Sequence, residues 1–252
     1  MKRLIAFDLD GTLAESKQAI DAEMGALLAG LSRWIVVAVI SGGDWPQFQQ
    51  QLIGNLPKGI DLSRWFLLPT SGTKLYRHEG GDWRQVYAQS FTDDERTRIL
   101  RALDTAVVAA GLSEDRIWGD RIEDRGSQIT FSGLGQHAPL EAKQLWDPDF
   151  IKRKRLQAAL APLLPRFAVR VGGSTSIDIT REGVDKAFGM SQLADVAGIP
   201  TKDMIFLGDA IYPGGNDDAV RAAGIDSIAV RDVHETKRVA EGITLCLAGM
   251  RE

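Results

Sequence analysis

The stretch Leu4-Ile5-Ala6-Phe7-Asp8-Leu9-Asp10-Gly11-Thr12 joins a short apolar run to two closely spaced aspartates. Four consecutive apolar residues are typical of a strand that is buried on both faces. The aspartates and the glycine that follow predict a loop at the carboxyl end of that strand. The stretch therefore predicts the first strand of an α/β sheet, with carboxylates at the edge where such sheets bind ligands.

The same pattern of an apolar strand followed by a polar loop recurs along the chain. Trp34–Ile40 precedes Ser41-Gly42-Gly43, and Met204–Leu207 precedes Gly208-Asp209. Trp65–Leu68 and Ser227–Val230 have the same strand character. The apolar periodicity predicts helices between these strands, at Gln18–Leu31, Lys186–Ala197, Asn216–Ala223 and His234–Ala240. This alternation predicts an α/β fold with a doubly wound, Rossmann-like parallel sheet.

The middle of the chain lacks this alternation. We expect a long helix over Phe91–Ala110 and a second helix over Asp149–Leu164. The strands expected around them are Arg116–Ile122, Ser127–Ser132, Ala168–Val171 and Thr175–Thr180. Pairs of strands around a helix indicate an α+β module inserted into the sheet domain. We place the core domain at residues 1–84 and 187–252 and the inserted cap domain at residues 85–186.

The composition excludes several classes of protein. The chain has 252 residues, is 44% hydrophobic and carries a formal net charge of −4. Nucleic acid is not an expected partner, because proteins that bind it are usually basic. No apolar run is long enough to span a membrane, and the basic start of the chain meets Asp8 too soon for a signal peptide. We therefore expect a soluble, cytoplasmic protein without a membrane partner.

Cys246 is the only cysteine of the chain, so an intrachain disulfide cannot form. A single thiol favours a reducing compartment. Because free cysteines are usually buried and Leu245 and Leu247 flank this one, we expect a buried thiol.

Four aspartates follow two of the predicted strands, Leu4–Phe7 and Met204–Leu207. They are Asp8, Asp10, Asp209 and Asp217. A single aspartate after a strand more often forms a turn or a helix cap. Several carboxylates gathered on one edge, however, would repel each other unless a cation lay among them. Because oxygen ligands suit Mg²⁺, we expect these four residues to form a magnesium site.

The segment Asp8-Leu9-Asp10-Gly11-Thr12 resembles the first motif of the haloacid dehalogenase superfamily. Ser41, Lys186 and the stretch Gly208–Asp217 resemble its second, third and fourth motifs, in the same order. The resemblance covers essentially the whole chain, and it extends to an inserted cap of the α/β kind. Within the superfamily, Gly208–Asp217 and Gly183-Val184-Asp185-Lys186 are most similar to the eukaryotic-type phosphomannomutases.

The resemblance implies a role for each motif residue. Asp8 would attack phosphorus and form an aspartyl phosphate. Asp10 would protonate the leaving oxygen and then deprotonate the second nucleophile, and its backbone carbonyl would bind the metal. Ser41 and Lys186 would contact the phosphoryl group. Other residues of the phosphate loops would bind the substrate, namely Thr12 and Gly42.

Some of these residues also have purely structural interpretations. Ser41 could cap the helix that begins near Asp44 or Trp45. Lysine at position 186 could be a solvated helix residue, and Thr12 could serve only as a cap.

The cap contains a second set of candidate residues. In Gly173–Thr180 the period of two places Ser176 and Asp178 on a polar face, which is either an ordinary wet surface or one that binds sugar hydroxyls. The mutases have matching Ser and Asp residues, and Arg125 matches one of their cap arginines. Gln136 stands where they have a second cap arginine, and their third cap arginine has no match in this chain. We include all four residues in the expected substrate site.

The substitution at Gln136 bears on the reaction, because a mutase must hold a phosphate at each end of its intermediate. On this basis we predict a magnesium-dependent phosphatase of a sugar phosphate, with a phosphomannomutase-type mutase as the alternative. A phosphorylation-switched binding module is less favoured, because such a module needs no cap. The resemblance also suggests a homodimer formed through the cap.

Overall fold

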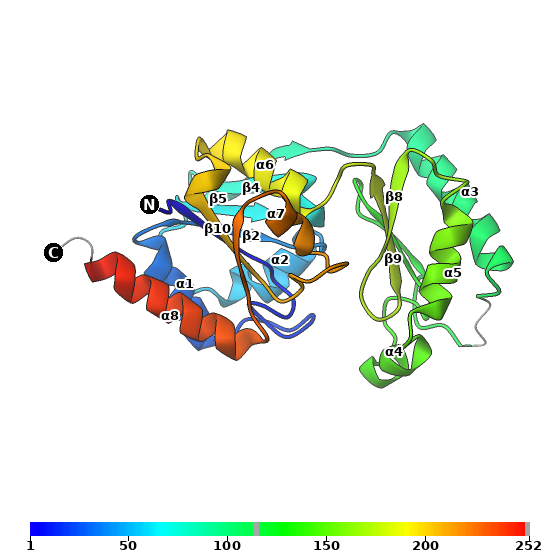
Figure 1. Cartoon of the computed structure of the whole chain (residues 1–252), viewed down its shortest axis with the longest axis horizontal. Coiled ribbons are helices and arrows are strands. Elements are labelled where there is room, and N and C mark those ends of the chain that lie inside the picture. The colour runs from blue at the N-terminus through cyan, green and yellow to red at the C-terminus, as the bar shows by residue number, and fades with distance from the viewer. Residues whose placement is uncertain (113–115, 250–252) are drawn as a thin grey trace. The chain divides into compact units, whose positions relative to one another are not determined.

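The computed structural model of the protein describes residues 1–112 and 116–249. The chain folds into two compact units, a core of residues 1–88 and 185–252 and a cap of residues 89–184 (Figure 1). The domain boundaries expected from the sequence differ from these by two to four residues. An expected boundary after residue 84 would cut the strand β5 (Asp82–Ala88), which pairs along its length within the core.

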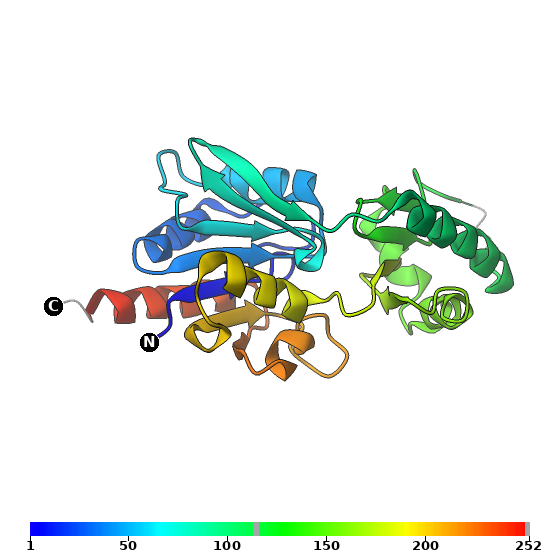
Figure 2. The same cartoon turned by 90° about the horizontal axis from the view of Figure 1, so that it is seen from above.

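The core is built on a seven-stranded sheet in the order β11-β10-β1-β2-β3-β4-β5 (Figure 2). The five strands from β11 to β3 are parallel, and β4 and β5 add an antiparallel hairpin at one edge. The parallel, doubly wound sheet is confirmed. The hairpin was not predicted. The strands are β1 (Leu4–Phe7), β2 (Val36–Ile40), β3 (Trp65–Leu68), β4 (Lys74–Glu79), β5 (Asp82–Ala88), β10 (Met204–Gly208) and β11 (Asp226–Ala229).

Helices cover both faces of the core sheet. Ile5 and Phe7 of β1 pack with α1 (Ala22–Ser32) and α8 (Val233–Gly249) on one face. Leu4 and Ala6 face the other side, where the buried residues come from α6 (Lys186–Ala197) and α7 (Asp218–Ala222). This alternation explains why β1 is apolar at every position. The remaining helical segments of the core are α2 (Trp45–Gln51) and the 3₁₀ turns Ile53–Asn55, Thr70–Gly72 and Thr201–Asp203.

The thiol of Cys246 is exposed, so the expectation of a buried cysteine is wrong. α8 continues to Gly249, well beyond the helix expected over His234–Ala240. Ile243 and Leu247 of this helix pack against the core, which turns Cys246 towards solvent. The flanking leucines were a poor guide, because a helix buries residues three or four apart and not neighbours.

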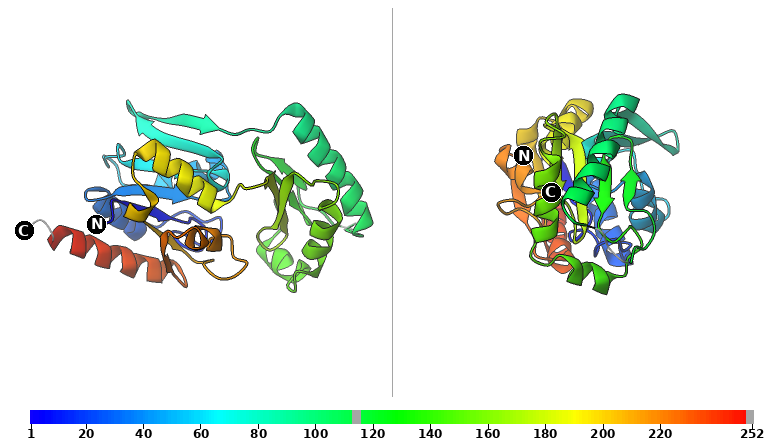
Figure 3. Two further views of the ribbon diagram at one scale, coloured as in Figure 1. Left: turned by 45° about the horizontal axis from the view of Figure 1, so that its top comes forward. Right: turned by 90° about the vertical axis from the view of Figure 1, so that its right-hand side faces the viewer.

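The cap is an antiparallel sheet in the order β6-β7-β9-β8, with helices on one face (Figure 3). Its strands are β6 (Ile122–Asp124), β7 (Ile129–Ser132), β8 (Phe167–Val171) and β9 (Ser176–Arg181). Its helices are α3 (Asp93–Ala109), α4 (Leu140–Trp146) and α5 (Ile151–Leu160). The strand expected over Arg116–Ile122 is wrong except for its last residue, and α4 was not predicted.

The hydrophobic core of the cap lies between its sheet and its helices. Ile177 and Ile179 of β9 are fully buried in it, as is Ile99 of α3. Ser176 and Asp178 therefore lie on the opposite, polar face of β9, as the period of two predicts. Within the part of the chain that the structure describes, no helix has the length and apolar character to cross a membrane.

Candidate active site

Asp8 lies in the first position after β1. Its backbone N–H donates to Leu207 O at 2.9 Å, which continues the pairing of β1 with β10 by one residue. Its side chain is almost fully buried, with 4% of its surface exposed. The chain then turns at Gly11, which has a φ of +83°, and a Cβ at this position would collide with the carboxylate of Asp209. Glycine here therefore allows the first loop to approach the loop after β10.

Lys186, the first residue of α6, joins two buried carboxylates. Its Nζ lies 2.7 Å from Asp8 Oδ1 and 2.5 Å from Asp217 Oδ1. Asp217 is fully buried, and its other oxygen, Oδ2, accepts a hydrogen bond from the backbone N–H of Ala210 at 3.1 Å. Lys186 is therefore a buried ion-pair partner and not a solvated helix residue. Burial alone would lower the pKa of Lys186, but the two carboxylates hold it above its ordinary value.

Asp209 completes a group of three carboxylates with Asp8 and Asp217. One oxygen from each residue lies within 4.8 Å of the others. Thr12 is fully buried and its Oγ1 donates to Asp209 Oδ1 at 3.2 Å, so Thr12 orients Asp209. Because Lys186 supplies one positive charge against three negative ones, the group fits a divalent cation. The carboxylate of Asp10 is not part of this group.

The protonation of Asp8 leads to the same conclusion. The pKa of Asp8 is raised to about 8, chiefly by burial and also by the charges of Asp217 and Asp209, against the attraction of Lys186. A protonated carboxyl group is a poor nucleophile. A cation between the three carboxylates would favour the ionised form of Asp8 that can attack phosphorus.

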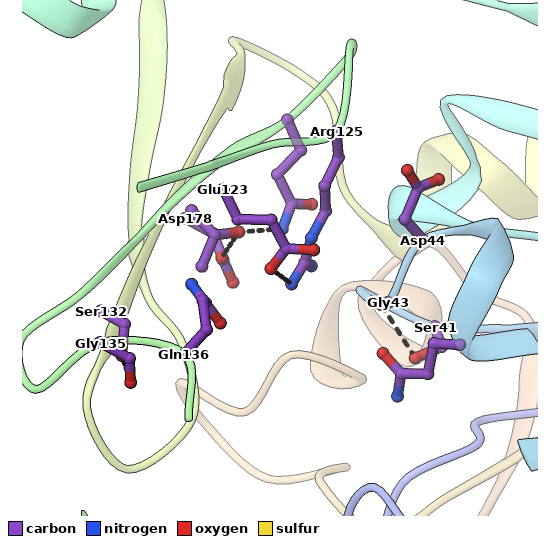
Figure 4. Close-up of polar contacts among 12 residues, drawn as sticks. Ser41, Gly43, Asp44, Glu123, Arg125, Ser132, Gly135, Gln136 and Asp178 are labelled. Carbon is purple, nitrogen blue, oxygen red and sulfur yellow. Dashed lines mark hydrogen bonds and ion pairs between the residues drawn. The ribbon is translucent and has the colours of Figure 1, made fainter. Parts of the chain in front are cut away.

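Ser41 lies at the end of β2 and is 3% exposed. Its Oγ accepts a hydrogen bond from the N–H of Gly43 at 3.2 Å (Figure 4). The N-cap of α2 is Asp44, whose carboxylate accepts from Trp45 N. The helix-capping interpretation of Ser41 is therefore wrong. A Cβ at Gly42 would meet no atom within 4 Å, so this loop has open space beside it.

The carboxylate of Asp10 accepts hydrogen bonds from two glutamines of α2, Gln47 and Gln51. Sequence reasoning missed both. The spacing of four residues would have revealed that they share one face of the helix, directly after the Ser41-Gly42-Gly43 loop.

The polar face of the cap sheet carries a row of neighbouring side chains. Glu123 pairs in register with Thr130, and Thr130 with Asp178. Thr130 Oγ1 donates to Asp178 Oδ1 at 2.7 Å, and Arg125 Nη2 lies 2.7 Å from Glu123 Oε2 (Figure 4). Burial raises the pKa of Asp178, and the charge of Arg125 opposes that effect. The structure thus brings Arg125 and Asp178 into one network.

Ser176 and Gln136 lie in the same unit. Ser176 pairs in register with Ser132 of β7, next to the segment that contains Gln136. The backbone of Gln136 is fixed by Asp120 O and by Lys143 Nζ, but its side-chain Nε2 is buried without a hydrogen-bond partner among the described residues. A buried donor without an acceptor is costly, so this amide is suited to a ligand.

Comparison with known proteins gives a consistent result. A family model described as eukaryotic phosphomannomutase matches residues 24–242. A phosphomannomutase of Schizosaccharomyces pombe is 26% identical over 86% of this chain and 84% of its own length. A phosphomannomutase of Encephalitozoon cuniculi is 25% identical over 94% and 91% of the two chains. Human phosphomannomutase 1 is 27% identical over 85% and 81%.

Solved structures share the fold at lower identity. A truncated Plasmodium falciparum IMP-nucleotidase has a TM-score of 0.68 and 15% identity, covering 96% of this chain and 70% of its own. A trehalose-6-phosphate phosphatase related protein has a TM-score of 0.58 and 19% identity, covering 99% and 100%. These matches show a core with an inserted cap and carry no information on the substrate.

Proposed function

Because the chain belongs to the eukaryotic phosphomannomutase family of the haloacid dehalogenase superfamily, we propose that it is a phosphosugar mutase. It moves a phosphoryl group between two oxygens of a hexose phosphate, by way of Asp8. One observation carries this proposal: Asp8 is buried against Lys186 in a group of three carboxylates. The chain that holds this group matches the family over residues 24–242.

The sequence-based preference for a phosphatase is therefore wrong. It depended on the cap arginines, because Gln136 stands where the resemblance led us to expect one and a third has no match in the chain. The family match and the relatives named phosphomannomutase, which align along most of the chain, contradict it. One neutral side chain in the cap does not decide which molecule accepts the phosphoryl group, because Arg125 and the rest of the polar face also contribute.

The proposed reaction has two half-reactions with the same groups. In the first, a carboxylate oxygen of Asp8 forms a bond to one phosphorus of a hexose bisphosphate while the bond from that phosphorus to the sugar oxygen breaks. The electron pair stays on the sugar oxygen, which receives a proton from Asp10, and a hexose monophosphate is left. In the second, Asp10 takes a proton from a hydroxyl of a hexose monophosphate, and that oxygen displaces Asp8 from phosphorus. Lys186 and Ser41 offset the charge of the phosphoryl oxygens.

We assign a Mg²⁺ ion to the carboxylate group as the cofactor. Asp8, Asp209 and Asp217 would hold it, together with the backbone carbonyl of Asp10. When bound, Mg²⁺ reduces the repulsion between the Asp8 carboxylate and the phosphate dianion. Thr12 supports this assignment, because its hydroxyl fixes one oxygen of Asp209.

The sugar is recognised by the cap in this proposal. Arg125 supplies a positive charge for a phosphate or an acceptor oxygen, and Ser176 and Asp178 supply hydrogen bonds to hydroxyl groups. Gln136 donates to a sugar or phosphate oxygen through Nε2, which has no partner among the described residues. The partner is thus a small phosphorylated sugar.

The test is a product assay with mannose 1-phosphate, Mg²⁺ and a trace of hexose 1,6-bisphosphate, followed by ³¹P NMR. We expect mannose 6-phosphate to accumulate without a matching release of inorganic phosphate. Steady release of inorganic phosphate without mannose 6-phosphate would contradict the proposal. An Asp8→Asn variant serves as the control and should form neither product.

A further inference from the structure

Two glutamines of α2 lie on one face of the helix because four residues separate them. Gln47 Nε2 donates to Asp10 Oδ2 at 2.8 Å, and Gln51 Nε2 donates to Asp10 Oδ1 at 3.2 Å. The backbone N–H of Lys17 donates to the same Oδ1 at 2.7 Å. The carboxylate is thus held from three directions, by one helix and by the loop that follows the first motif.

The two amides are themselves fixed. Gln51 is 2% exposed, and its Nε2 also donates to the backbone carbonyl of Gln18 at 2.9 Å. Its Oε1 accepts from Gln47 Nε2 at 2.6 Å, so both hydrogens of each amide nitrogen are used. Gln47 also packs on Gly43, where a Cβ would collide with its Oε1. A long, flexible side chain is therefore held in one orientation next to Asp10.

The hydrogen bonds leave the two oxygens of Asp10 unequal. Oδ1 accepts two of them, from Gln51 Nε2 and Lys17 N, and Oδ2 accepts one, from Gln47 Nε2. A carboxylate oxygen offers about two lone-pair sites. Oδ1 is therefore saturated, and Oδ2 keeps one site for a further proton. Among residues 1–112 and 116–249, Gln47 alone donates a hydrogen bond to this second oxygen.

We propose that Gln47 is a positioning residue for proton transfer, that Gln51 anchors it, and that Asp10 exchanges its proton through Oδ2. This inference rests on the proposed function. When the bond from phosphorus to the sugar oxygen breaks, the proton moves from Asp10 Oδ2 to that oxygen and the negative charge stays on the carboxylate. The amide N–H of Gln47 then donates a hydrogen bond to the ionised oxygen and holds the carboxylate in its orientation.

A positioning role predicts a dependence on the leaving group that a structural role does not. A sugar alkoxide is a strong base and needs a proton as it leaves, so its departure depends on Asp10. Acetate is a stable anion, so the transfer of phosphate from acetyl phosphate to Asp8 needs no acid. Loss of Gln47 should therefore slow phosphorylation of Asp8 by a sugar phosphate more than phosphorylation by acetyl phosphate.

The experiment compares wild type with Gln47→Met, which preserves size and removes the amide. The matched control is Gln50→Met, the same substitution at an exposed position of the same helix. The rate of Asp8 phosphorylation is followed by rapid quench and intact-protein mass spectrometry, with hexose 1,6-bisphosphate and separately with acetyl phosphate as donors.

For Gln47→Met we expect a rate with the bisphosphate that is lower by roughly 10- to 100-fold, and a rate with acetyl phosphate within about 3-fold of wild type. Gln50→Met should match wild type with both donors. A Gln47→Glu variant, which places a second negative charge beside Asp10, should retain the rate with acetyl phosphate and lose more of the rate with the bisphosphate.

Equal loss with both donors, or no loss with either, would overturn the positioning role of Gln47. The thermal unfolding of each variant is measured alongside, and a variant that is unfolded at the assay temperature is replaced by Gln47→Leu. The proposed function fails separately, namely if wild type itself is phosphorylated by acetyl phosphate and not by the bisphosphate.

Discussion

The ammonium group of Lys186 lies 2.7 Å from the carboxylate of Asp8. Both side chains are almost fully buried, and Lys186 also contacts Asp217 at 2.5 Å. The nucleophile of the proposed reaction therefore has a fixed positive partner inside the protein. This pair links the loop after β1 to the start of α6. Lys186 should therefore contribute both to the unfolding free energy of the core and to the proposed reaction.

Replacing Lys186 with Met should reduce kcat/KM roughly 10²- to 10³-fold, because a fixed charge next to the transferring phosphoryl group is lost. It should also lower the free energy of unfolding in EDTA by about 3 kcal/mol, because buried carboxylates lose their ionic partner. Steady-state kinetics and urea unfolding measure the two effects. Wild-type activity in this variant would exclude Lys186 from the reaction.

Asp209→Asn should raise the Mg²⁺ concentration needed for half-maximal activity roughly 10-fold or more and leave the unfolding free energy in EDTA almost unchanged. Asp209 is half-buried, and its loss leaves the contacts of Lys186 intact. Asp217→Asn is the comparison variant, because it also weakens the contact with Lys186 and should destabilise the core. The Mg²⁺ requirement of each variant is measured by titrating the activity of EDTA-treated protein with magnesium, and its stability is measured by urea unfolding in EDTA. An unchanged titration for Asp209→Asn would argue against the assigned site.

The ion pair of Glu95 and Arg181 should make the stability of the cap depend on pH. Hydrogen bonds from Arg181 and from the N–H of Thr92 lower the pKa of Glu95 from 4.5 to about 2. A lowered pKa stabilises the folded state above pH 4.5, and this stabilisation is lost as the pH falls towards 2. Glu95→Gln should thus destabilise the protein by about 1 kcal/mol at pH 7 and by much less near pH 2.5. Urea unfolding at the two pH values checks this, and a difference that is independent of pH would refute it.

Arg153 should be essential for the stability of the cap. It is 3% exposed, its Nε lies 2.7 Å from Asp147 Oδ2, and its guanidinium also donates to the carbonyls of Gly172 and Gly173 before β9. Arg153→Met should lower the unfolding free energy by about 3 to 5 kcal/mol, because Asp147 would remain buried and unpaired. The exposed Arg155 on the same helix provides the control. Arg155→Met should change the unfolding free energy by less than about 0.5 kcal/mol. Urea unfolding of both variants compares them, and equal effects would contradict the special role of Arg153.

The position of the site was predictable because it depends on local sequence. Apolar runs that end in Asp8 and Asp209 place both side chains at the carboxyl ends of neighbouring parallel strands, and the pairing of β1 with β10 brings them together. The contact between Lys186 and Asp217 was not predictable from spacing, because 31 residues separate them and the distance depends on how α6 and the following loop pack.

The elements that sequence reasoning missed have weak local signals. The hairpin strands β4 and β5 mix polar with apolar residues and are mostly half-buried or exposed, so they lack the apolar run that identified β1. The glutamines Gln47 and Gln51 are uncharged, and in the sequence they look like residues of a solvent-exposed helix surface. Their importance appears only when the fold places α2 next to Asp10.

The most direct test of the central claim follows the phosphoryl group itself. Wild-type protein is labelled with [³²P]hexose 1,6-bisphosphate in the presence of Mg²⁺, separated from the sugar and then mixed with unlabelled mannose 1-phosphate. We predict that the label is bound to Asp8, is absent in Asp8→Asn, and passes to the sugar phosphate within a turnover. Label that appears as inorganic phosphate instead, or that binds equally to Asp8→Asn, would contradict the account.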